Sequence, residues 1–145
     1  MNFRILTIAG VVAFLSACNQ SSQPQFEMPS SPIDQSTAET MLMRSLQAQE
    51  AGDVEAEKAD LFPRQNNVLV ACARLRAGNG RIASTAMRDE NGVVPKITGV
   101  TVSGLHQGPA ANIYSGSYSA TGNAAYSGSE TFIWANGRWW IRCNV

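Results

Sequence analysis

The sequence predicts an α+β domain in which two N-terminal helices pack on a bent antiparallel sheet. Helical spacing of apolar residues and helix-capping residues mark residues 36–62. After Pro63 the chain turns to β-branched and aromatic residues separated by glycine-rich turns. It ends in two apolar segments around Asn136-Gly137, a pattern typical of a hairpin. Residues 36–145 are enough for a single domain with its own core.

The first helix is expected over residues 36–51. Ser36 and Glu39 have the spacing of a capping box, in which the hydroxyl and the carboxylate each bond an amide of the first turn. Apolar residues recur inside the segment every three or four positions, which predicts one buried face. Gly52 then stands where a helix usually ends in a left-handed residue.

A second, shorter helix is expected over residues 54–62. Asp53 is placed to cap it, and Glu55 suits the positive end of the helix dipole. Pro63 cannot continue a helix, so it sets the end of this segment.

The segment 64–96 is ambiguous. Residues 67–77 alternate as on a strand and also recur as on a helix, and the flanking Asn and Gly favour a strand. Further strands are expected at 81–87, 93–94, 97–105 and 111–120, with a turn at Asn91-Gly92 and an exposed loop over 121–128.

Residues 131–135 and 138–142 form the predicted C-terminal hairpin around Asn136-Gly137, the preferred two-residue type I′ turn. That turn sets the register, because it pairs Ala135 with Arg138 and every earlier residue with its counterpart. One face of the hairpin should be buried; it carries Phe132, Trp134, Trp139, Ile141 and Cys143.

The other face of the hairpin places Trp140 between Arg138 and Arg142, beside Thr131 and Ile133. A Trp flanked by arginines can serve as a binding platform. More often such a face is simply the second face of a sheet packed under a loop, and the sequence leaves both interpretations open.

The N-terminus reads as an export signal. Arg4 precedes an apolar run that ends in Leu15-Ser16-Ala17-Cys18. The run of about eleven residues is too short to span a bilayer of about 30 Å as a helix. An ordinary cleaved signal is the alternative, but it prefers a small residue three positions before the cut, where Leu15 stands.

Leu15, Ser16, Ala17 and Cys18 match all four positions of the bacterial lipobox, which they closely resemble. The resemblance implies a lipid on Cys18, removal of residues 1–17 and usually a third acyl chain such as palmitate. Two or three chains anchor a protein durably, at about 0.8 kcal/mol for each buried methylene. Asn19 favours sorting to the outer membrane, facing the periplasm. Residues 18–35, rich in Gln, Ser and Pro, are expected to form a flexible tether.

With Cys18 committed to lipid, Cys72 and Cys143 remain as a pair. The compartment beyond the inner membrane is oxidising, so a disulfide between them is expected. A metal site and a reactive thiol are poorer alternatives, because the chain has no CxxC motif and one histidine.

Charge is balanced overall but unevenly distributed. Between Glu27 and Asp60 there are eight acids and two basic residues, and from Arg64 onward eight basic residues and three acids. The two halves can attract one another on folding, or the basic part can face an anionic partner. The basic residues are scattered, so nucleic acid is not an expected partner.

Catalysis would need a base, a nucleophile or a metal in a pocket. His106, near Gly104 and Gly108, fits a solvated turn, and no second histidine exists for a metal pair. Asp89-Glu90 precede a turn and no GxSxG motif occurs. Neither a catalytic residue nor a metal or other cofactor is expected.

A second resemblance covers most of residues 36–145. Residues 46–53, with Glu55 and Ala56, and the ending 132–141 are similar to the NTF2-like superfamily. The resemblance implies a cone-shaped α+β fold with a third helix or first strands in residues 64–96. The chain lacks the Asp/His pair of the superfamily's enzymes, which implies a non-catalytic role.

The leading hypothesis is a lipid-anchored, non-enzymatic binding or accessory module of the bacterial envelope. It would bind an envelope protein or a small ligand through the concave sheet face or a surface with Trp140, Arg138, Arg142 and His106. One alternative is a structural lipoprotein subunit of a secretion or conjugation assembly. The other is a small NTF2-like enzyme that uses His106.

Overall fold

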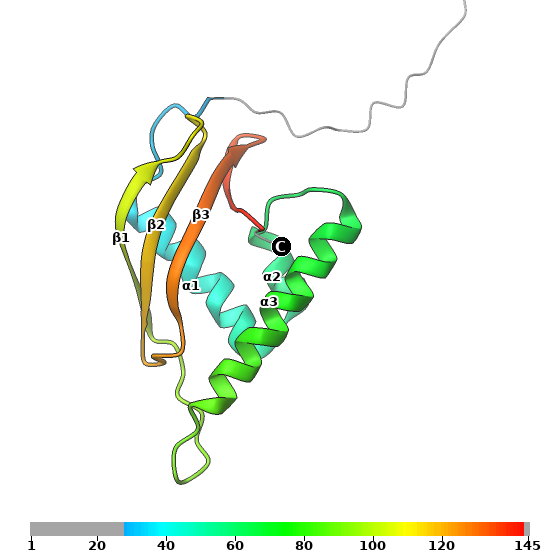
Figure 1. The fold of residues 1–145 in the computed structure, drawn as a ribbon, viewed down its shortest axis with the longest axis vertical. Helices are drawn as coiled ribbons and strands as arrows, with labels where there is room; N and C mark the ends of the chain where they lie inside the picture. Colours follow the sequence, from blue (N-terminus) through cyan, green and yellow to red (C-terminus); the bar gives the residue numbers. More distant parts are fainter. Residues whose placement is uncertain (1–27, 144–145) are drawn as a thin grey trace, which may run out of the picture.

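A computed structural model describes residues 28–143 and confirms the α+β class, with helices first and an antiparallel sheet after them (Figure 1). The two expected helices are joined by a third in this part of the chain. The elements are α1 (Gln35–Ala51), α2 (Val54–Asp60), α3 (Asn66–Ala86), β1 (Gly99–Gln107), β2 (Ile113–Thr121), β3 (Ser127–Ala135) and β4 (Arg138–Ile141).

The start of α1 differs from the expected capping box. Asp34 is the cap, because its carboxylate accepts a hydrogen bond from the Thr37 amide at 2.7 Å, and Ser36 lies inside the helix. Glu39 is free of the capping role and instead accepts from the Val102 amide of β1 at 3.0 Å. Glu39 thereby covers an amide that an edge strand would expose.

The junction between α1 and α2 is as expected. Gly52 ends α1 in the left-handed region with φ of 71°, and Asp53 caps α2 by accepting from the amides of Glu55 and Ala56. The second helix ends at Asp60, two residues before the predicted end at residue 62. Leu61 and Phe62 are extended because they lie beside β4, where the Phe62 amide donates to the Ile141 carbonyl at 2.8 Å.

The largest error of the sequence interpretation is α3, since residues 67–77 and 81–87 were expected to form strands. The buried face of α3 consists of small residues rather than large apolar ones: Cys72, Ala73, Ala77, Gly80 and Ser84. They allow a close approach to α1, as a β-carbon on Gly80 would lie 2.5 Å from Cβ of Gln49. That packing stabilises the helical conformation of this segment, and no local sequence pattern reveals it.

The four strands form a meander in the order β1-β2-β3-β4, and the helices lie against one face of it (Figure 1). The hairpin register is confirmed in full, from Ala135 opposite Arg138 to Phe132 opposite Ile141. The first two strands lie about two residues later than expected, and β3 begins at Ser127, inside the predicted loop 121–128.

Residues 93–94 were also expected to form a strand and do not. They follow the predicted turn at Asn91-Gly92, in which Gly92 has φ of 80°. The carboxylate of Asp89 accepts from the amides of Asn91 and Val93, so its role is to hold the turn.

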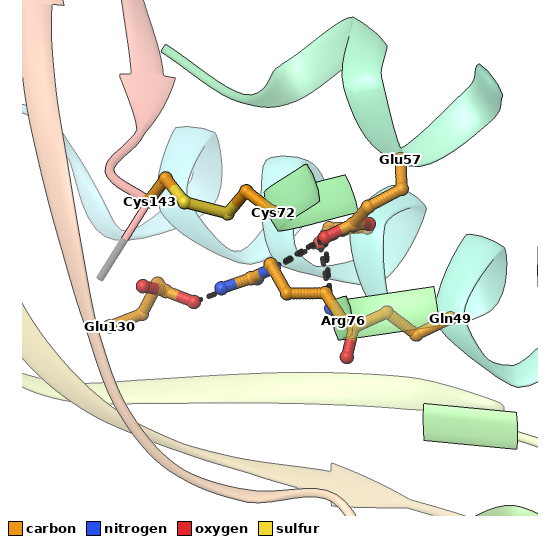
Figure 2. The surroundings of a disulfide bond; sticks show 7 residues. Gln49, Glu57, Cys72, Arg76, Glu130 and Cys143 are labelled. Carbon is orange, nitrogen blue, oxygen red and sulfur yellow. Dashed lines mark hydrogen bonds and ion pairs between the residues drawn. A yellow bond between two sulfur atoms is a disulfide. The ribbon is translucent and has the colours of Figure 1, made fainter. Parts of the chain in front are cut away.

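The main core lies between the helices and the inner face of the sheet, where Leu42 of α1 meets Phe132 and Ile141. Ile33, which precedes the first helix, is 4% exposed and packs into this core. The expected disulfide is present: Cys72 of α3 is bonded to Cys143 after β4, with Cα atoms 6.2 Å apart (Figure 2). It ties the last strand to the third helix.

The outer face of the sheet has two parts. Serine and threonine side chains of the first three strands are exposed there, among them Thr101, Ser117 and Ser129. Near β4 the face is covered, because Phe62 packs on Ile133 and Trp140. In the part of the chain that the structure describes, no helix is long and apolar enough to cross a membrane.

Candidate functional site

An open groove runs between α1, α2 and the β3–β4 hairpin. We call it the hairpin groove and define it by Arg44, Asp60 and Arg138, which line both of its parts. One part measures about 630 Å³ and has a floor of alanines: Ala48, Ala51, Ala56 and Ala59. The other measures about 300 Å³ and is partly aromatic; it is lined by Thr37, Met41, Trp134, Gly137 and Trp139.

The middle of the groove is an ion pair between α1 and the end of α2. Arg44 donates to both oxygens of Asp60, at 2.9 Å from Nε and 2.7 Å from Nη2. This hydrogen-bonded contact raises the pKa of Arg44. The Asp60 side chain is 8% exposed, whereas that of Arg44 is 58% exposed. The guanidinium therefore still faces solvent while the carboxylate is covered.

Arg138 forms the opposite rim of the groove and is held in place from two sides. Its Nη2 donates to the carbonyl of Ala59 in the last turn of α2 at 2.6 Å. Its guanidinium carbon lies 3.5 Å from the ring centroid of Trp140, a cation–π contact. Trp140 is itself fixed by a hydrogen bond from Nε1 to the Ala135 carbonyl at 2.8 Å. Arg138 is thus exposed yet preorganised.

The aromatic end of the groove is built by the two inward-facing hairpin tryptophans. Trp139 packs edge-on against Trp134 and against Tyr114 of β2, with centroid distances of 5.4 and 5.6 Å. Among the described residues, Nε1 of Trp134 is a buried donor without a hydrogen-bond partner. Such a donor carries a desolvation cost of about 1–3 kcal/mol.

The four residues predicted as a binding surface lie on the outer side of the sheet but do not form one site. His106 lies on β1, at one edge of the sheet, opposite Ser115 of β2. Arg142 follows β4 at the other edge. Three strand spacings, about 14 Å in total, separate those edges. Trp140 is half-buried and packs against the cluster formed by Phe62 and Ile133. Arg138 alone of the four lines the groove.

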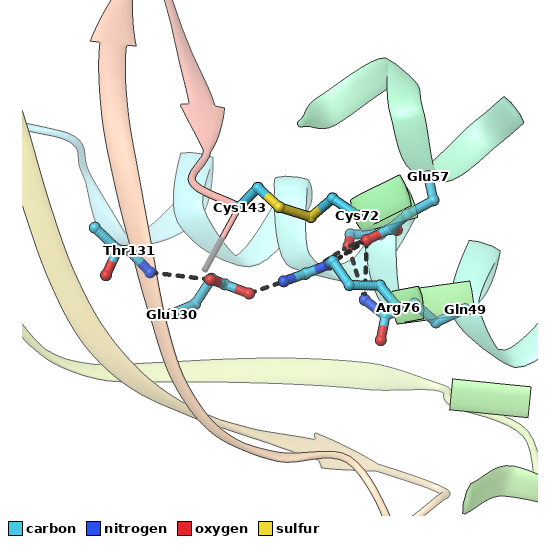
Figure 3. Close-up of polar contacts among 8 residues, drawn as sticks. Gln49, Glu57, Cys72, Arg76, Glu130, Thr131 and Cys143 are labelled. Carbon is cyan, nitrogen blue, oxygen red and sulfur yellow. Dashed lines mark hydrogen bonds and ion pairs between the residues drawn. A yellow bond between two sulfur atoms is a disulfide. The ribbon is translucent and has the colours of Figure 1, made fainter. Parts of the chain in front are cut away.

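A cluster of buried charges lies beside the disulfide, between the helices and β3 (Figures 2 and 3). Arg76 of α3 contacts Glu57 of α2 at 2.5 Å through Nε and Glu130 of β3 at 2.9 Å through Nη2. Glu57 is 0% exposed and also accepts from Ser45 and Gln49 of α1. The cluster joins three helices to the sheet.

The cluster holds two carboxylates and one guanidinium, and its energetics follow from that imbalance. Burial raises the pKa of Glu130, and its contacts with Arg76 offset this only in part. Burial alone would lower the pKa of Arg76, but Glu130 and Glu57 outweigh it and the pKa is raised. Arg76 is therefore charged at every physiological pH.

His106 stands apart from these features. It is exposed, and its Nδ1 lies 2.8 Å from the carbonyl of Gly104 on its own strand. It lines neither part of the hairpin groove. Within residues 28–143 no group of three or more His, Cys, Asp or Glu residues is placed to hold a metal ion.

Sequence reasoning missed Arg44, Asp60 and Met41 as parts of a site. Arg44 was noted only as one of two basic residues in an acidic stretch. Its pairing with Asp60 could have been sought, because the two helices that carry them meet at the predicted Gly52-Asp53 joint. Arg138, the third wall of the groove, was predicted as part of a binding surface, but no local signal places it beside α1 and α2, because it comes from the far end of the chain.

Comparisons with known proteins return no relatives. No family model, no curated protein and no solved structure matches this chain. The likeness to the lipobox and to the NTF2-like superfamily therefore remains a prediction from the sequence. Residues 1–27, which include Leu15, Ser16, Ala17 and Cys18, lie outside the described residues.

Proposed function

We propose that this protein is a lipoprotein of the bacterial envelope whose folded domain is a non-enzymatic binding module. Lipid on Cys18 would hold it at a membrane, in the outer membrane facing the periplasm. The hairpin groove would bind an extended segment of an envelope protein. The observation that carries this proposal is the groove itself, with one exposed, preorganised arginine on its rim.

The chemistry of the groove favours an extended chain with an acidic group and an apolar anchor. Among the described residues Arg138 donates only through Nη2, so its other N–H groups remain available, and the exposed Arg44 adds a second cation. A carboxylate matches the planar fork of a guanidinium. The alanine floor leaves room for a backbone to lie close, and Met41 and Trp139 offer an apolar wall at the other end.

The ion pairs support binding rather than catalysis. Asp60 is bonded to Arg44 through both oxygens, and Glu57 and Glu130 are bonded to Arg76. A carboxylate held by an arginine in this way is less available to accept a proton, and of these three only Asp60 lines the groove. The side chain of His106, the residue of the enzyme hypothesis, is exposed and lies against the Gly104 carbonyl of its own strand, outside the groove.

Site-specific photocrosslinking in cells tests the groove. A photoreactive residue at Gln47, an exposed residue of the groove wall, should form an adduct with an envelope protein through a segment that contains Asp or Glu. The same residue at Ser117, on the exposed sheet face, is the positional control. Arg138→Ala should abolish the Gln47 adduct, whereas Arg64→Ala, an exposed arginine outside the groove, should not. Equal adducts from both positions, or an adduct indifferent to Arg138→Ala, would contradict the proposal.

A further inference from the structure

The solvent-facing side of α3 is apolar where a surface helix is normally polar. We define the outer α3 face by five exposed residues at helical spacing: Ala71, Leu75, Gly78, Ile82 and Ala86. Ile82 is 70% exposed and Leu75 is 49% exposed, and they lie two turns apart, about 10.5 Å. The opposite side of the helix is the one that packs on α1, and none of residues 28–143 buries this face.

Charge on the same helix has one sign. Arg74 and Arg81 lie on one border of the outer α3 face, seven residues apart, and Arg88 follows the helix at the same interval. The 21 residues of α3 contain no Asp or Glu. The nearest acids in sequence, Asp89 and the exposed Glu90, are in the next turn, where the carboxylate of Asp89 accepts from backbone amides. The face therefore combines exposed apolar side chains with a basic border, in which Arg81 also lies near Gly52 and lines a pocket with Glu50 of α1.

These features select among possible occupants. A second copy of the chain, docked through the same face, would bring the Arg74 and Arg81 borders of both helices together with no acid on either helix to pair them. A protein partner would need a complementary hollow, because the large side chains of the face stand singly on a convex helix. A bilayer surface accepts isolated apolar side chains and, if anionic, attracts the arginines.

We propose that the outer α3 face docks on an anionic phospholipid surface, with Leu75 and Ile82 entering the headgroup region and Arg74 and Arg81 contacting lipid phosphates. The inference deepens the proposed lipid anchoring and rests on it for proximity, since a tether would keep the domain near the bilayer. It also gives the orientation of the domain relative to the membrane. The helices lie against one face of the sheet (Figure 1), and the exposed hydroxyl-bearing residues lie on the opposite face, which would therefore point away from the membrane.

A nitroxide label on the outer α3 face tests the docking. Gly78→Cys is the labelling site, because a β-carbon there meets no atom within 4 Å and the other two thiols of the domain form the disulfide. The full, acylated chain is reconstituted into vesicles of phosphatidylcholine alone or mixed with phosphatidylglycerol. In the mixed vesicles the label should become more accessible to oxygen and less accessible to a water-soluble nickel complex, and high salt should reverse this.

Matched variants assign the effect to this face. Arg74→Gln with Arg81→Gln should return the label to solvent, whereas Lys58→Gln with Arg64→Gln removes the same charge elsewhere and should not. The same chain prepared without acyl groups can be added to vesicles from solution. Its partitioning should fall about thirty-fold with the Arg74 and Arg81 changes, from about 1 kcal/mol for each arginine.

Three results would overturn the inference. The label stays accessible to nickel in both kinds of vesicle, or it becomes protected equally in both, or label–label broadening appears without lipid and shows that two copies meet here. Failure of the anchor is a separate outcome. In that case mass spectrometry of the purified chain shows no acyl groups. The partitioning of the non-acylated chain from solution into vesicles still tests the outer α3 face.

Discussion

Arg76 donates through Nε to Oε1 of Glu57 at 2.5 Å, in a site where the Glu57 side chain has no exposure to solvent. The pair connects α3 to α2, and through Glu130 it reaches β3. Substituting one member of a buried pair leaves a charge without compensation. The cluster is therefore a point at which single substitutions should have large and opposite effects.

Arg76→Met should destabilise the domain by about 3–5 kcal/mol at neutral pH, because two buried carboxylates lose their cation. Urea unfolding followed by tryptophan fluorescence measures the change. Arg64→Met, at an exposed position, should change stability by less than about 0.5 kcal/mol. Similar losses for both variants would show that the cluster is not the cause.

Glu130→Gln should have the opposite effect at neutral pH. The pKa of Glu130 is raised by burial, so the folded state binds this proton more tightly than the unfolded state. The stabilisation from this proton is full below the ordinary pKa of 4.5 and is lost as the pH rises through the raised value. The free energy of unfolding of the variant should equal that of the wild type at acidic pH and should exceed it increasingly towards pH 7. Unfolding free energies that run in parallel across this range would refute the shift.

The disulfide should contribute roughly 4 kcal/mol, because it restricts the unfolded chain over a sequence separation of 71 residues. Cys72→Ala with Cys143→Ala should show this loss in denaturant unfolding. Peptide mapping, without reductant, of the protein isolated from cells should link the two cysteines. Free thiols at both positions in that protein would count against the bond in the cell.

Two glycines of α3 provide a matched pair of substitutions. Gly80→Ala should destabilise by about 1–3 kcal/mol, since its β-carbon would approach Cβ of Gln49 to 2.5 Å. Gly78→Ala should stabilise by up to about 1 kcal/mol, because the site is open and alanine favours a helix. Thermal unfolding of both variants measures the difference. Equal effects would mean that α3 does not pack closely on α1 at Gly80.

The lipid anchor gives the remaining prediction. Mass spectrometry of the protein from bacterial membranes should show a chain that begins at Cys18 and carries acyl groups. Cys18→Ser should abolish acylation and release the protein from the membrane fraction, since one or more lipid chains supply the attachment. An unmodified N-terminus in the wild-type protein would exclude the anchor.

Local signals predicted the parts of the fold that depend on neighbours in sequence. The Asn136-Gly137 turn specified the hairpin register, since a two-residue turn leaves no alternative pairing. The Gly52-Asp53 joint was predicted for the same reason, because a left-handed residue and a cap act within one turn of the helix. The disulfide was predicted from cysteine number and compartment rather than from geometry.

The third helix and the hairpin groove could not be predicted in this way. Gly80 disfavours a helix by itself, yet it is what lets α3 approach Gln49 of α1. The groove needs Arg44 and Asp60 from the first two helices and Arg138 from the last hairpin. Residues so far apart along the chain meet only when the core forms.

The sequence by itself determined the α+β class, the order of helices before strands, the hairpin register and the pairing of Cys72 with Cys143. The first three follow from capping, turn chemistry and the alternation of apolar residues, which act over a few positions, whereas the cysteine pairing follows from the number of cysteines and the expected compartment. Tertiary packing decided that residues 66–86 are a helix and that Trp140 packs against the cluster of Phe62 and Ile133 and supports Arg138. It decided them because burial against a distant element outweighs weak local preferences of a few tenths of a kcal/mol per residue.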